Sequence, residues 1–368
     1  MTPEARITGI RARAYTIPTD KPEADGTIAW DKTTIVIAEA DAGGKTGIGY
    51  TYADASIVPL IEKKLKEAVA GVDAMDVPSA FRKMTATIRN LGHPGLVATA
   101  ISAVDGALWD LKGKLLDLPL CQLLGKNRDA VPIYGSGGFT TYDDAELREQ
   151  LGGWVHRDGC AWVKMKIGSE PDRDPARVAV ARSAIGERPG LFIDANGAFD
   201  RKQAIVMAER CVGEGVMWFE EPVSSDDLEG MHFVRNHVPS PVQVAAGEYG
   251  YTLDYFRRML EAQAVDVLQA DVTRCGGITG WLAVEALTQA NHIDLSAHCA
   301  PAMHLHAACS ARRLRHLEWF HDHVRIEQML FDGAPYAKDG AIRPDLSRPG
   351  LGLTLKERDA ARYQVGGG

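Results

Sequence analysis

The chain has 368 residues, of which 45% are hydrophobic and 24% are charged, a composition that is ordinary for soluble globular proteins. Its formal net charge of -8 at pH 7, with both signs mixed, argues against nucleic acid as the main partner, because phosphate binding requires a basic surface. No apolar run approaches the roughly 20 residues of a membrane span.

The amino-terminal sequence MTPEARITGIRARAYTIPT lacks a basic head followed by an apolar core, so it contains no recognisable secretory signal. The six cysteines are scattered and form no CxxC pair: Cys121, Cys160, Cys211, Cys275, Cys299 and Cys309. In a chain of this size these features predict reduced, mostly buried thiols and a cytoplasmic location.

Residues 1–55 alternate in polarity like a β-meander, with the polar segment PTDKPEADGTIAWDK (18–32) between two predicted strands. Helical patterns occupy about 56–125. The clearest is ATAISAVDGALWDLKGKLLDLP, in which apolar residues recur at helical spacing and Pro119 lies near the end.

From residue 131 onward, short apolar runs recur between helix-like segments. They predict eight strands, at 131–138, 162–168, 190–197, 216–223, 242–248, 265–272, 294–299 and 316–320. Strands that alternate with helices pair in parallel, and eight units is the count of a (β/α)₈ barrel. The long gap after the first strand and an indistinct last helix also allow a modified, seven-unit barrel. The tail from about 332 is loop-rich and is expected to pack on the amino-terminal domain.

Polar residues interrupt the ends of these predicted strands with regularity. They are Lys164, Lys166, Asp194, Asn196, Glu220, Glu221, Glu248, Asp271, His298 and Glu318. Ionised groups rarely enter a core unless they are paired or bound to metal. In a barrel, active sites form at the carboxyl ends of the strands, so seven consecutive strands with titratable groups predict an active site there.

Asp194, Glu220 and Glu248 come from three adjacent predicted strands, so their carboxylates should converge. Three anions in one concavity raise each other's pKa unless a cation lies among them. All-oxygen ligation favours Mg²⁺, with Mn²⁺ as a substitute, over zinc. For any one of these residues, a salt-bridged carboxylate is the alternative.

The stretch WVKMKIG (162–168) places Lys164 and Lys166 on the same face of a strand with apolar flanks. Two ammonium groups beside a divalent metal disfavour each other's protonation, so one lysine pKa is expected to fall toward neutrality. A neutral lysine is a competent base, and its charged partner can hold a substrate carboxylate. The alternative is an edge strand with solvated lysines.

Asp271 and His298 come from neighbouring predicted strands. A carboxylate bonded to one imidazole nitrogen fixes the tautomer and raises the basicity of the ring, which predicts an acid/base dyad. Glu318 either donates a hydrogen bond when protonated or pairs with a lysine.

Together these residues resemble the enolase superfamily, specifically its mandelate racemase subgroup, over nearly the whole chain. VKMKIG resembles the Lys-x-Lys element, FIDANG, WFEEPV and AAGE the metal-ligand strands, and ADVTRCGGITGW with SAHC the Asp–His dyad. HLEWF resembles the eighth-strand glutamate element. The resemblance implies an α/β fold: a modified TIM barrel, (β/α)₇β, with an α+β capping domain. The implied boundaries are 1–128 for the cap, 129–331 for the barrel and 332–368 for a segment that packs on the cap.

The resemblance also implies one Mg²⁺ per subunit, held by Asp194, Glu220 and Glu248. Lys166 would remove the proton α to a substrate carboxylate that Lys164 contacts. His298, oriented by Asp271, would act on the other face, and Glu318 would help to stabilise the enediolate. The use of a Lys or His base with Mg²⁺ is a general property of such sites. The implied partner is a small-molecule carboxylate, and a homo-oligomer is expected.

The fate of the enediolate is left open by these motifs. Dehydration of an acid sugar to a 2-keto-3-deoxy acid is favoured, because dehydratases are common in the subgroup and the segment 18–32 makes a polar lid. The alternative is a racemase or epimerase of a 2-hydroxy acid. Trp30, Tyr52 and Asn196 are candidate substrate-binding residues, as are Asp20, Lys21 and Asp25 in the lid, unless that segment is merely solvated.

Two more distant alternatives are a zinc-dependent barrel hydrolase and a non-catalytic binding protein. The His-rich stretches HLH (304–306) and HDH (321–323) would suit the hydrolase, but a His-x-His metal motif belongs at the first barrel strand, where this chain has GSGG. These histidines are therefore expected on a surface helix or loop.

Overall fold

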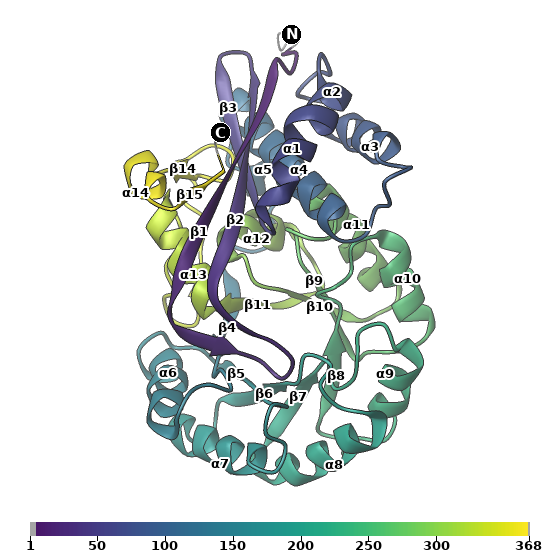
Figure 1. The fold of residues 1–368 in the computed structure, drawn as a ribbon, viewed down its shortest axis with the longest axis vertical. Coiled ribbons are helices and arrows are strands. Elements are labelled where there is room, and N and C mark those ends of the chain that lie inside the picture. The colour runs from purple at the N-terminus through teal and green to yellow at the C-terminus, as the bar shows by residue number, and fades with distance from the viewer. Residues whose placement is uncertain (1–4, 367–368) are drawn as a thin grey trace.

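The computed structural model describes residues 5–366, which form an α+β cap over a barrel (Figure 1). The cap begins with three antiparallel strands, β1 (Gly9–Ala24), β2 (Ala29–Ala42) and β3 (Lys45–Tyr52). Helical turns over 55–69 follow, and then α3 (Val77–Thr87), α4 (Leu96–Leu116) and α5 (Leu120–Leu124). The helix α4 is predicted by the sequence, and its periodic apolar residues pack against the sheet. Gly47 and Gly49 allow this close approach, since a Cβ at either position would lie within 2.4 Å of the α4 backbone.

Eight parallel strands close into a barrel through the pairing of the last with the first, which confirms the fold class predicted from the sequence. The strands are β4 (Val131–Gly137), β5 (Trp162–Lys166), β6 (Gly190–Asp194), β7 (Val216–Glu220), β8 (Gln243–Ala246), β9 (Val267–Ala270), β10 (Asp294–Ala297) and β11 (Leu314–Phe320). The helices between them are α6 (Asp144–His156), α7 (Asp174–Ile185), α8 (Arg201–Cys211), α9 (Leu228–Arg235), α10 (Leu253–Glu261), α11 (Gly277–Ala290) and α12 (Pro301–Ser310).

The alternation of side chains along each strand separates the two faces of the barrel wall. Val163 and Met165 point outward into the main core beneath the helices. Inward-pointing Tyr134, Phe192 and Trp218 form a separate apolar cluster inside the barrel. Because side chains alternate between the two faces of a strand, the next inward-pointing position on β5, β6 and β7 lies two residues further toward the carboxyl end. These are the positions of the polar residues singled out in the sequence.

The chain after the barrel returns to both parts of the molecule. Its elements are α13 (His321–Leu330), β12 (Phe331–Asp332), β13 (Ala341–Ile342), β14 (Thr354–Leu355), α14 (Glu357–Ala361) and β15 (Gln364–Val365). β15 extends the cap sheet beside β1, whereas β13 pairs with β4 of the barrel. Buried Asp110 on α4 accepts backbone hydrogen bonds from Ile48 (2.7 Å) and from Leu351 in the tail (2.6 Å). The domain boundaries stay a prediction.

The polar segment 18–32 is not a loop between two shorter strands, so that part of the sequence prediction is wrong. β1 and β2 continue through it as one long hairpin with an irregularity between Pro18 and Glu23, and only residues 25–28 form the turn. The hairpin extends from the cap across the mouth of the barrel (Figure 1). Pairing with β2 on both sides of the irregularity, together with donors such as Thr141 Oγ1 to the Pro22 carbonyl, satisfies backbone groups of this stretch, which its polar composition did not reveal.

All six cysteines are buried free thiols, as predicted. Within residues 5–366, no helix combines the length and the apolar composition that crossing a bilayer requires.

A buried carboxylate joins the cap to the barrel at α13. Tyr50 on β3 donates a hydrogen bond to Glu327 Oε1 (2.6 Å), and the backbone N–H of Ala302 donates to Oε2 (2.9 Å). Burial raises the pKa of Glu327 to about 8, although both donors favour the charged form.

This pKa predicts a pH-dependent stability. A carboxyl group whose pKa is higher in the folded than in the unfolded state favours folding below the unfolded value of about 4.5, and this contribution is lost as the pH rises through about 8. We expect Glu327→Gln to flatten the fall in the free energy of unfolding between these pH values, since the amide can still pair with Tyr50. Urea unfolding of both proteins at several pH values measures this slope. An unchanged slope would contradict the prediction.

Candidate active site

The register of the barrel brings polar residues from adjacent strands to one level at its carboxyl end. Lys166 on β5 is paired with Asp194 on β6, and Asp194 is paired with Glu220 on β7. Glu248 follows the end of β8. In the sequence these residues are 26 to 28 apart, but parallel pairing makes them spatial neighbours.

The three predicted metal ligands converge. Asp194, Glu220 and Glu248 are buried, and each offers one carboxylate oxygen such that the three oxygens lie within 4.8 Å of one another. Burial, and in addition the charge of Asp194, raise the pKa of Glu220 to about 8. An all-oxygen set of this size fits a hard divalent cation such as Mg²⁺.

A fourth carboxylate at this site is Glu221, which the sequence places among the polar strand-end residues without a predicted role. Its backbone φ is +38°, so the chain turns sharply after β7 and both glutamates of the EEP motif are buried. Its Oε1 has no hydrogen-bond partner within residues 5–366, and burial together with the charge of Glu248 raises its pKa well above the usual value. A left-handed backbone at a residue other than glycine is strained, and no periodicity in the sequence predicts it.

The two lysines lie on the inward face of β5 and contact the carboxylates. Lys166 Nζ lies 2.6 Å from Asp194 Oδ2 and 3.0 Å from Asn196 Oδ1. Lys164 is completely buried, forms an ion pair with Glu220, and lies 3.2 Å from Asp194 Oδ2. Lys166 reaches the wall of the active-site cavity, whereas Lys164 lies beneath it.

The protein's own charges do not lower the lysine pKa values. Burial disfavours the ammonium form of Lys166, but the charges of Asp194, Glu248 and Glu220 together outweigh burial and raise the pKa. The expected fall toward neutrality depends on a divalent cation that neutralises these carboxylates, so it stays a prediction for the metal-bound site.

The dyad predicted from the sequence has hydrogen-bonding geometry. His298 Nδ1 donates to Asp271 Oδ2 at 2.8 Å, so Nε2 is the nitrogen that can exchange a proton. His298 Nε2 lies 3.1 Å from Glu248 Oε2 and 3.5 Å from Glu318 Oε2. Burial opposes the charged imidazolium, but the surrounding carboxylates outweigh it and raise the pKa of His298.

Glu318 pairs with Lys164 at 2.8 Å and accepts a hydrogen bond from Ser136 Oγ at 2.5 Å. Burial favours its neutral form, but Lys164 and His298 hold its pKa well below the usual range. This corresponds to the second of the two alternatives from the sequence, the ion pair with a lysine.

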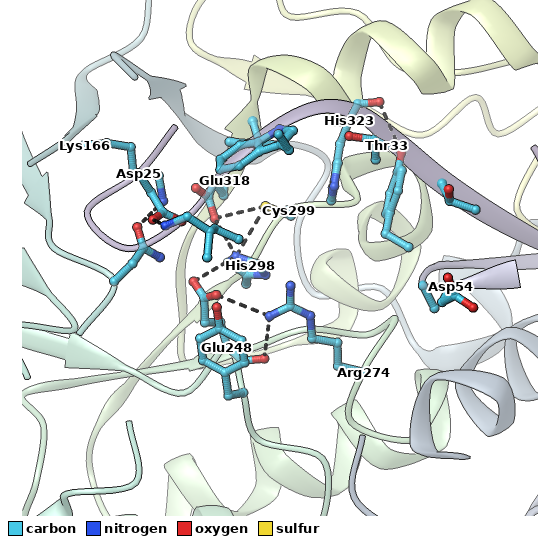
Figure 2. A pocket seen from close by; sticks show the side chains of 18 of the residues that line it. Asp25, Thr33, Asp54, Lys166, Glu248, Arg274, His298, Cys299, Glu318 and His323 are labelled. Carbon is cyan, nitrogen blue, oxygen red and sulfur yellow. Dashed lines mark hydrogen bonds and ion pairs between the residues drawn. The ribbon is translucent and has the colours of Figure 1, made fainter. Parts of the chain in front are cut away.

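A cavity of about 420 Å³ lies between these residues and the hairpin of the cap. Figure 2 shows Lys166, Glu248, His298 and Glu318 on one side of it. Three predicted substrate-binding residues, Trp30, Tyr52 and Asn196, also line it, together with Asp25, Ile28, Lys32, Thr33, Thr34, Ala53, Asp54, Tyr249, Arg274, Cys299, Phe320 and His323.

The hairpin contributes fewer polar groups to the cavity than the sequence suggested. Lys21 pairs with Glu146 (2.6 Å) and Asp20 with His321 (3.0 Å), so neither lines the cavity. Asp25 accepts hydrogen bonds from within its own turn, including the Ile28 N–H.

Trp30 is fixed in the cavity wall by its own contacts. Its indole N–H donates to the buried carboxylate of Glu23 at 2.8 Å, and its ring meets the edge of Phe139 at 5.7 Å. The sequence did not single out Glu23, because pairing across a hairpin cannot be read from local composition.

The prediction that both His-rich stretches lie on the surface is wrong. His304, His306 and His323 are buried, and only His321 is partly exposed. His304 Nε2 accepts a hydrogen bond from the backbone N–H of Val272 at 2.9 Å. His306 Nδ1 accepts one from Cys121 at 3.1 Å. These histidines cap backbone groups that would otherwise be buried without partners, a need that is set by packing rather than by sequence pattern.

The sequence reasoning missed three further residues on the cavity wall. Arg274 Nη1 lies 3.2 Å from Glu248 Oε1, and its guanidinium lies over the ring of Tyr249. Cys299 Sγ lies 3.4 Å from both His298 Nε2 and Glu318 Oε2. The third is His323. Arg274 belongs to ADVTRCGGITGW and Cys299 to SAHC, and both follow the ends of strands, β9 and β10. Their position after a barrel strand could therefore have identified them as candidates for the cavity wall.

A capped parallel barrel with converging carboxylates, a Lys-x-Lys strand and an Asp–His pair defines a class of metal-dependent enzymes that act on carbon acids. Comparison with known families agrees with this class. Residues 146–360 match the family described as "Enolase C-terminal domain-like", and residues 12–125 match "Mandelate racemase / muconate lactonizing enzyme, N-terminal domain". The chain therefore belongs to the mandelate racemase/muconate lactonizing enzyme family of the enolase superfamily, which confirms the resemblance.

Curated relatives in this family catalyse more than one reaction. The chain is 31% identical to 3,6-anhydro-alpha-L-galactonate cycloisomerase from Streptomyces coelicolor, over 98% of this chain and 100% of the relative. It is 30% identical to L-talarate/galactarate dehydratase from Salmonella typhimurium, over 96% of this chain and 90% of the relative. The chain is thus similar to enzymes of acid sugar chemistry, with isomerases and lyases both represented.

Solved structures that resemble this chain belong to the same family. A mandelate racemase/muconate lactonizing enzyme-like protein from Rubrobacter xylanophilus is 51% identical, with a TM-score of 0.96 over 98% of this chain and 100% of that chain. An enolase from Bradyrhizobium, in complex with magnesium and mandelic acid, is 29% identical, with a TM-score of 0.91 over 100% of both chains. The Mg²⁺ cofactor predicted from the sequence is confirmed by such magnesium-bound homologues.

Proposed function

We propose that this enzyme removes the proton α to the carboxylate of an acid sugar and then eliminates water to give a 2-keto-3-deoxy acid. The observation that carries the proposal is that Lys166 and His298 reach one cavity, while the three converging carboxylates come from strands that lie between theirs in the barrel. A substrate held beside that carboxylate cluster would therefore have a proton-transfer group on each side.

In this proposal Lys166 accepts the α-proton at Nζ, with Asn196 and Asp194 fixing the position of the amine. Glu318 lines the cavity, and Lys164, which lies beneath the wall, supplies a fixed positive charge through its ion pair with Glu318. His298 carries its transferable proton at Nε2, because Asp271 accepts the hydrogen bond from Nδ1. A general acid of this kind protonates the departing hydroxyl.

Asp194, Glu220 and Glu248 would hold one Mg²⁺, with Mn²⁺ as a substitute. When bound, the cation supplies the positive charge that stabilises the enediolate oxygens. A small-molecule carboxylate is the expected partner, and the homo-oligomer stays a prediction.

A racemase, epimerase or cycloisomerase is the second candidate, because His298 can equally return a proton to carbon. The observation that favours it is the identity of 31% to a cycloisomerase over the whole length of that relative. The two candidate reactions use the same Lys166, His298 and carboxylates. They differ in the atom that His298 protonates, which is the oxygen of the departing hydroxyl in the dehydratase and a carbon in the isomerase.

The deciding experiment is a panel of mono- and diacid sugars incubated with enzyme and Mg²⁺. We expect a 2-keto acid from at least one of them, detected with semicarbazide. Members that give no keto acid are incubated in D₂O, and the α-position is followed by proton NMR. Exchange or isomerisation without elimination would replace the lyase by the isomerase, and no exchange with any member would refute the proposal.

A further inference from the structure

His323 lies on the cavity wall in the first turn of α13, outside the set of groups that the proposed reaction uses (Figure 2). Its ring is fixed on two sides. It stacks on Tyr52 with ring centroids 3.4 Å apart and planes at 9°, and it meets the edge of Phe320 at 5.1 Å. Aromatic contacts on both sides restrict the side chain to one rotamer, so its polar atoms have fixed directions.

The hydrogen bonding of the ring determines its tautomer. The backbone N–H of Ala300, in the turn that precedes α12, donates to His323 Nδ1 at 3.3 Å. Nδ1 must therefore carry a lone pair, and the hydrogen of the neutral ring lies on Nε2. No residue of 5–366 forms a hydrogen bond with Nε2, and the side chain is 8% exposed, through the cavity that it lines.

The ring is neutral at ordinary pH. Burial lowers the pKa of His323 to about 3, although the charge of Asp271 opposes this shift. Nε2–H is thus an uncharged donor held toward the cavity, and an unsatisfied donor in a partly buried site favours a ligand that supplies an acceptor. A neutral donor suits a hydroxyl oxygen of the substrate. A second carboxylate on the substrate would need a cation to compensate fully for its burial.

We propose that His323 is a specificity residue that donates a hydrogen bond from Nε2 to a substrate hydroxyl outside the reacting carbons. The inference rests on the proposed acid sugar substrate and deepens it. The ligand it selects is a polyhydroxylated chain with one oxygen in a defined position beside Tyr52. The neighbouring wall has matching chemistry, since Thr33 Oγ1 donates to Asp322 and leaves its oxygen lone pairs to accept.

The test is a cycle of enzyme and substrate variants, applied to the acid sugar that the wild type turns over fastest and to its single-deoxy analogues. His323→Phe keeps the aromatic stack and removes the donor. We expect wild type to lose about 3- to 10-fold in kcat/KM, mostly through KM, on the analogue that lacks the recognised hydroxyl, which is the value of one hydrogen bond. On the parent sugar, the kcat/KM of His323→Phe should be lower than that of the wild type by the same factor. On the analogue that lacks the recognised hydroxyl, the variant and the wild type should have equal kcat/KM. His323→Gln, which keeps an N–H donor, should recover part of the loss.

His306→Phe is a matched control, because His306 is also a buried histidine whose Nδ1 accepts a backbone N–H, but it does not line this cavity. It should leave the discrimination between parent and analogues unchanged. If His323→Phe does not fold, as judged by circular dichroism, His323→Leu enters the same cycle. A loss of equal size on the parent and on every analogue, or no loss, would overturn the inference. The proposed function fails separately, if wild type neither eliminates water nor exchanges an α-proton.

Discussion

Replacing Lys166 by alanine should lower kcat by about 10²- to 10⁴-fold, the usual contribution of a positioned general base. Lys166 Nζ is the amine that reaches the cavity, 2.6 Å from Asp194 Oδ2, and Lys164 lies beneath the wall where it cannot take its place. Exchange of the substrate α-proton in D₂O, followed by NMR, measures the step directly.

The matched control for this variant is Lys202→Ala, since Lys202 is an exposed lysine on α8 away from the cavity. It should retain wild-type exchange. Binding of Mg²⁺ to Lys166→Ala should persist, because the three carboxylates are unchanged. Retained turnover in Lys166→Ala would remove this residue from the proposed reaction and leave His298 as the base to test.

Replacing Glu220 by glutamine should weaken Mg²⁺ binding by about a hundredfold or more, because it removes one of three converging anionic ligands. The amide has nearly the same shape, so packing inside the barrel changes little, and Trp218, which donates to Glu220 Oε2 at 2.9 Å, can still find an acceptor. Calorimetric titration with Mg²⁺, and electron paramagnetic resonance of bound Mn²⁺, measure binding without substrate.

Glu229→Gln tests whether the loss is specific to the site, because Glu229 is an exposed glutamate on α9, just beyond the same strand. This variant should bind Mg²⁺ like wild type. If Glu220→Gln binds the ion normally while folded, the carboxylates that hold it must be others. Glu221, which is buried beside this site and whose Oε1 has no partner in the described part of the chain, is then the first to examine.

The barrel and most of its polar rim were predictable because the information is local. Alternation with period two identifies strands such as 162–168, and helical spacing identifies segments such as α4. A parallel barrel then requires the carboxyl ends of all strands to meet at one face, so Asp194, Glu220 and Glu248 could be placed together without knowing any contact between them.

The lid was harder to predict, because its conformation depends on pairing between distant residues. The segment 18–32 is polar, which suggested a loop, but β1 and β2 extend into it and pair on both sides of an irregularity, and Lys21 points outward to Glu146. Trp30 lines the cavity, but its hydrogen bond to Glu23 depends on this pairing and could not be predicted. A one-residue change in register reverses the face of every side chain in a strand, and composition does not determine register.

By itself, the amino-acid sequence determined the order of strands and helices and the chemical identity of the groups at the strand ends, because both depend on short-range patterns. The tertiary structure alone decided which groups face the cavity. It buried His304, His306 and His323, placed Lys164 beneath Lys166, and turned Glu221 inward through a left-handed backbone. The reason is physical: the direction of a side chain at a closed barrel rim, and the hydrogen bonds that remain for it, depend on neighbours that are distant in sequence.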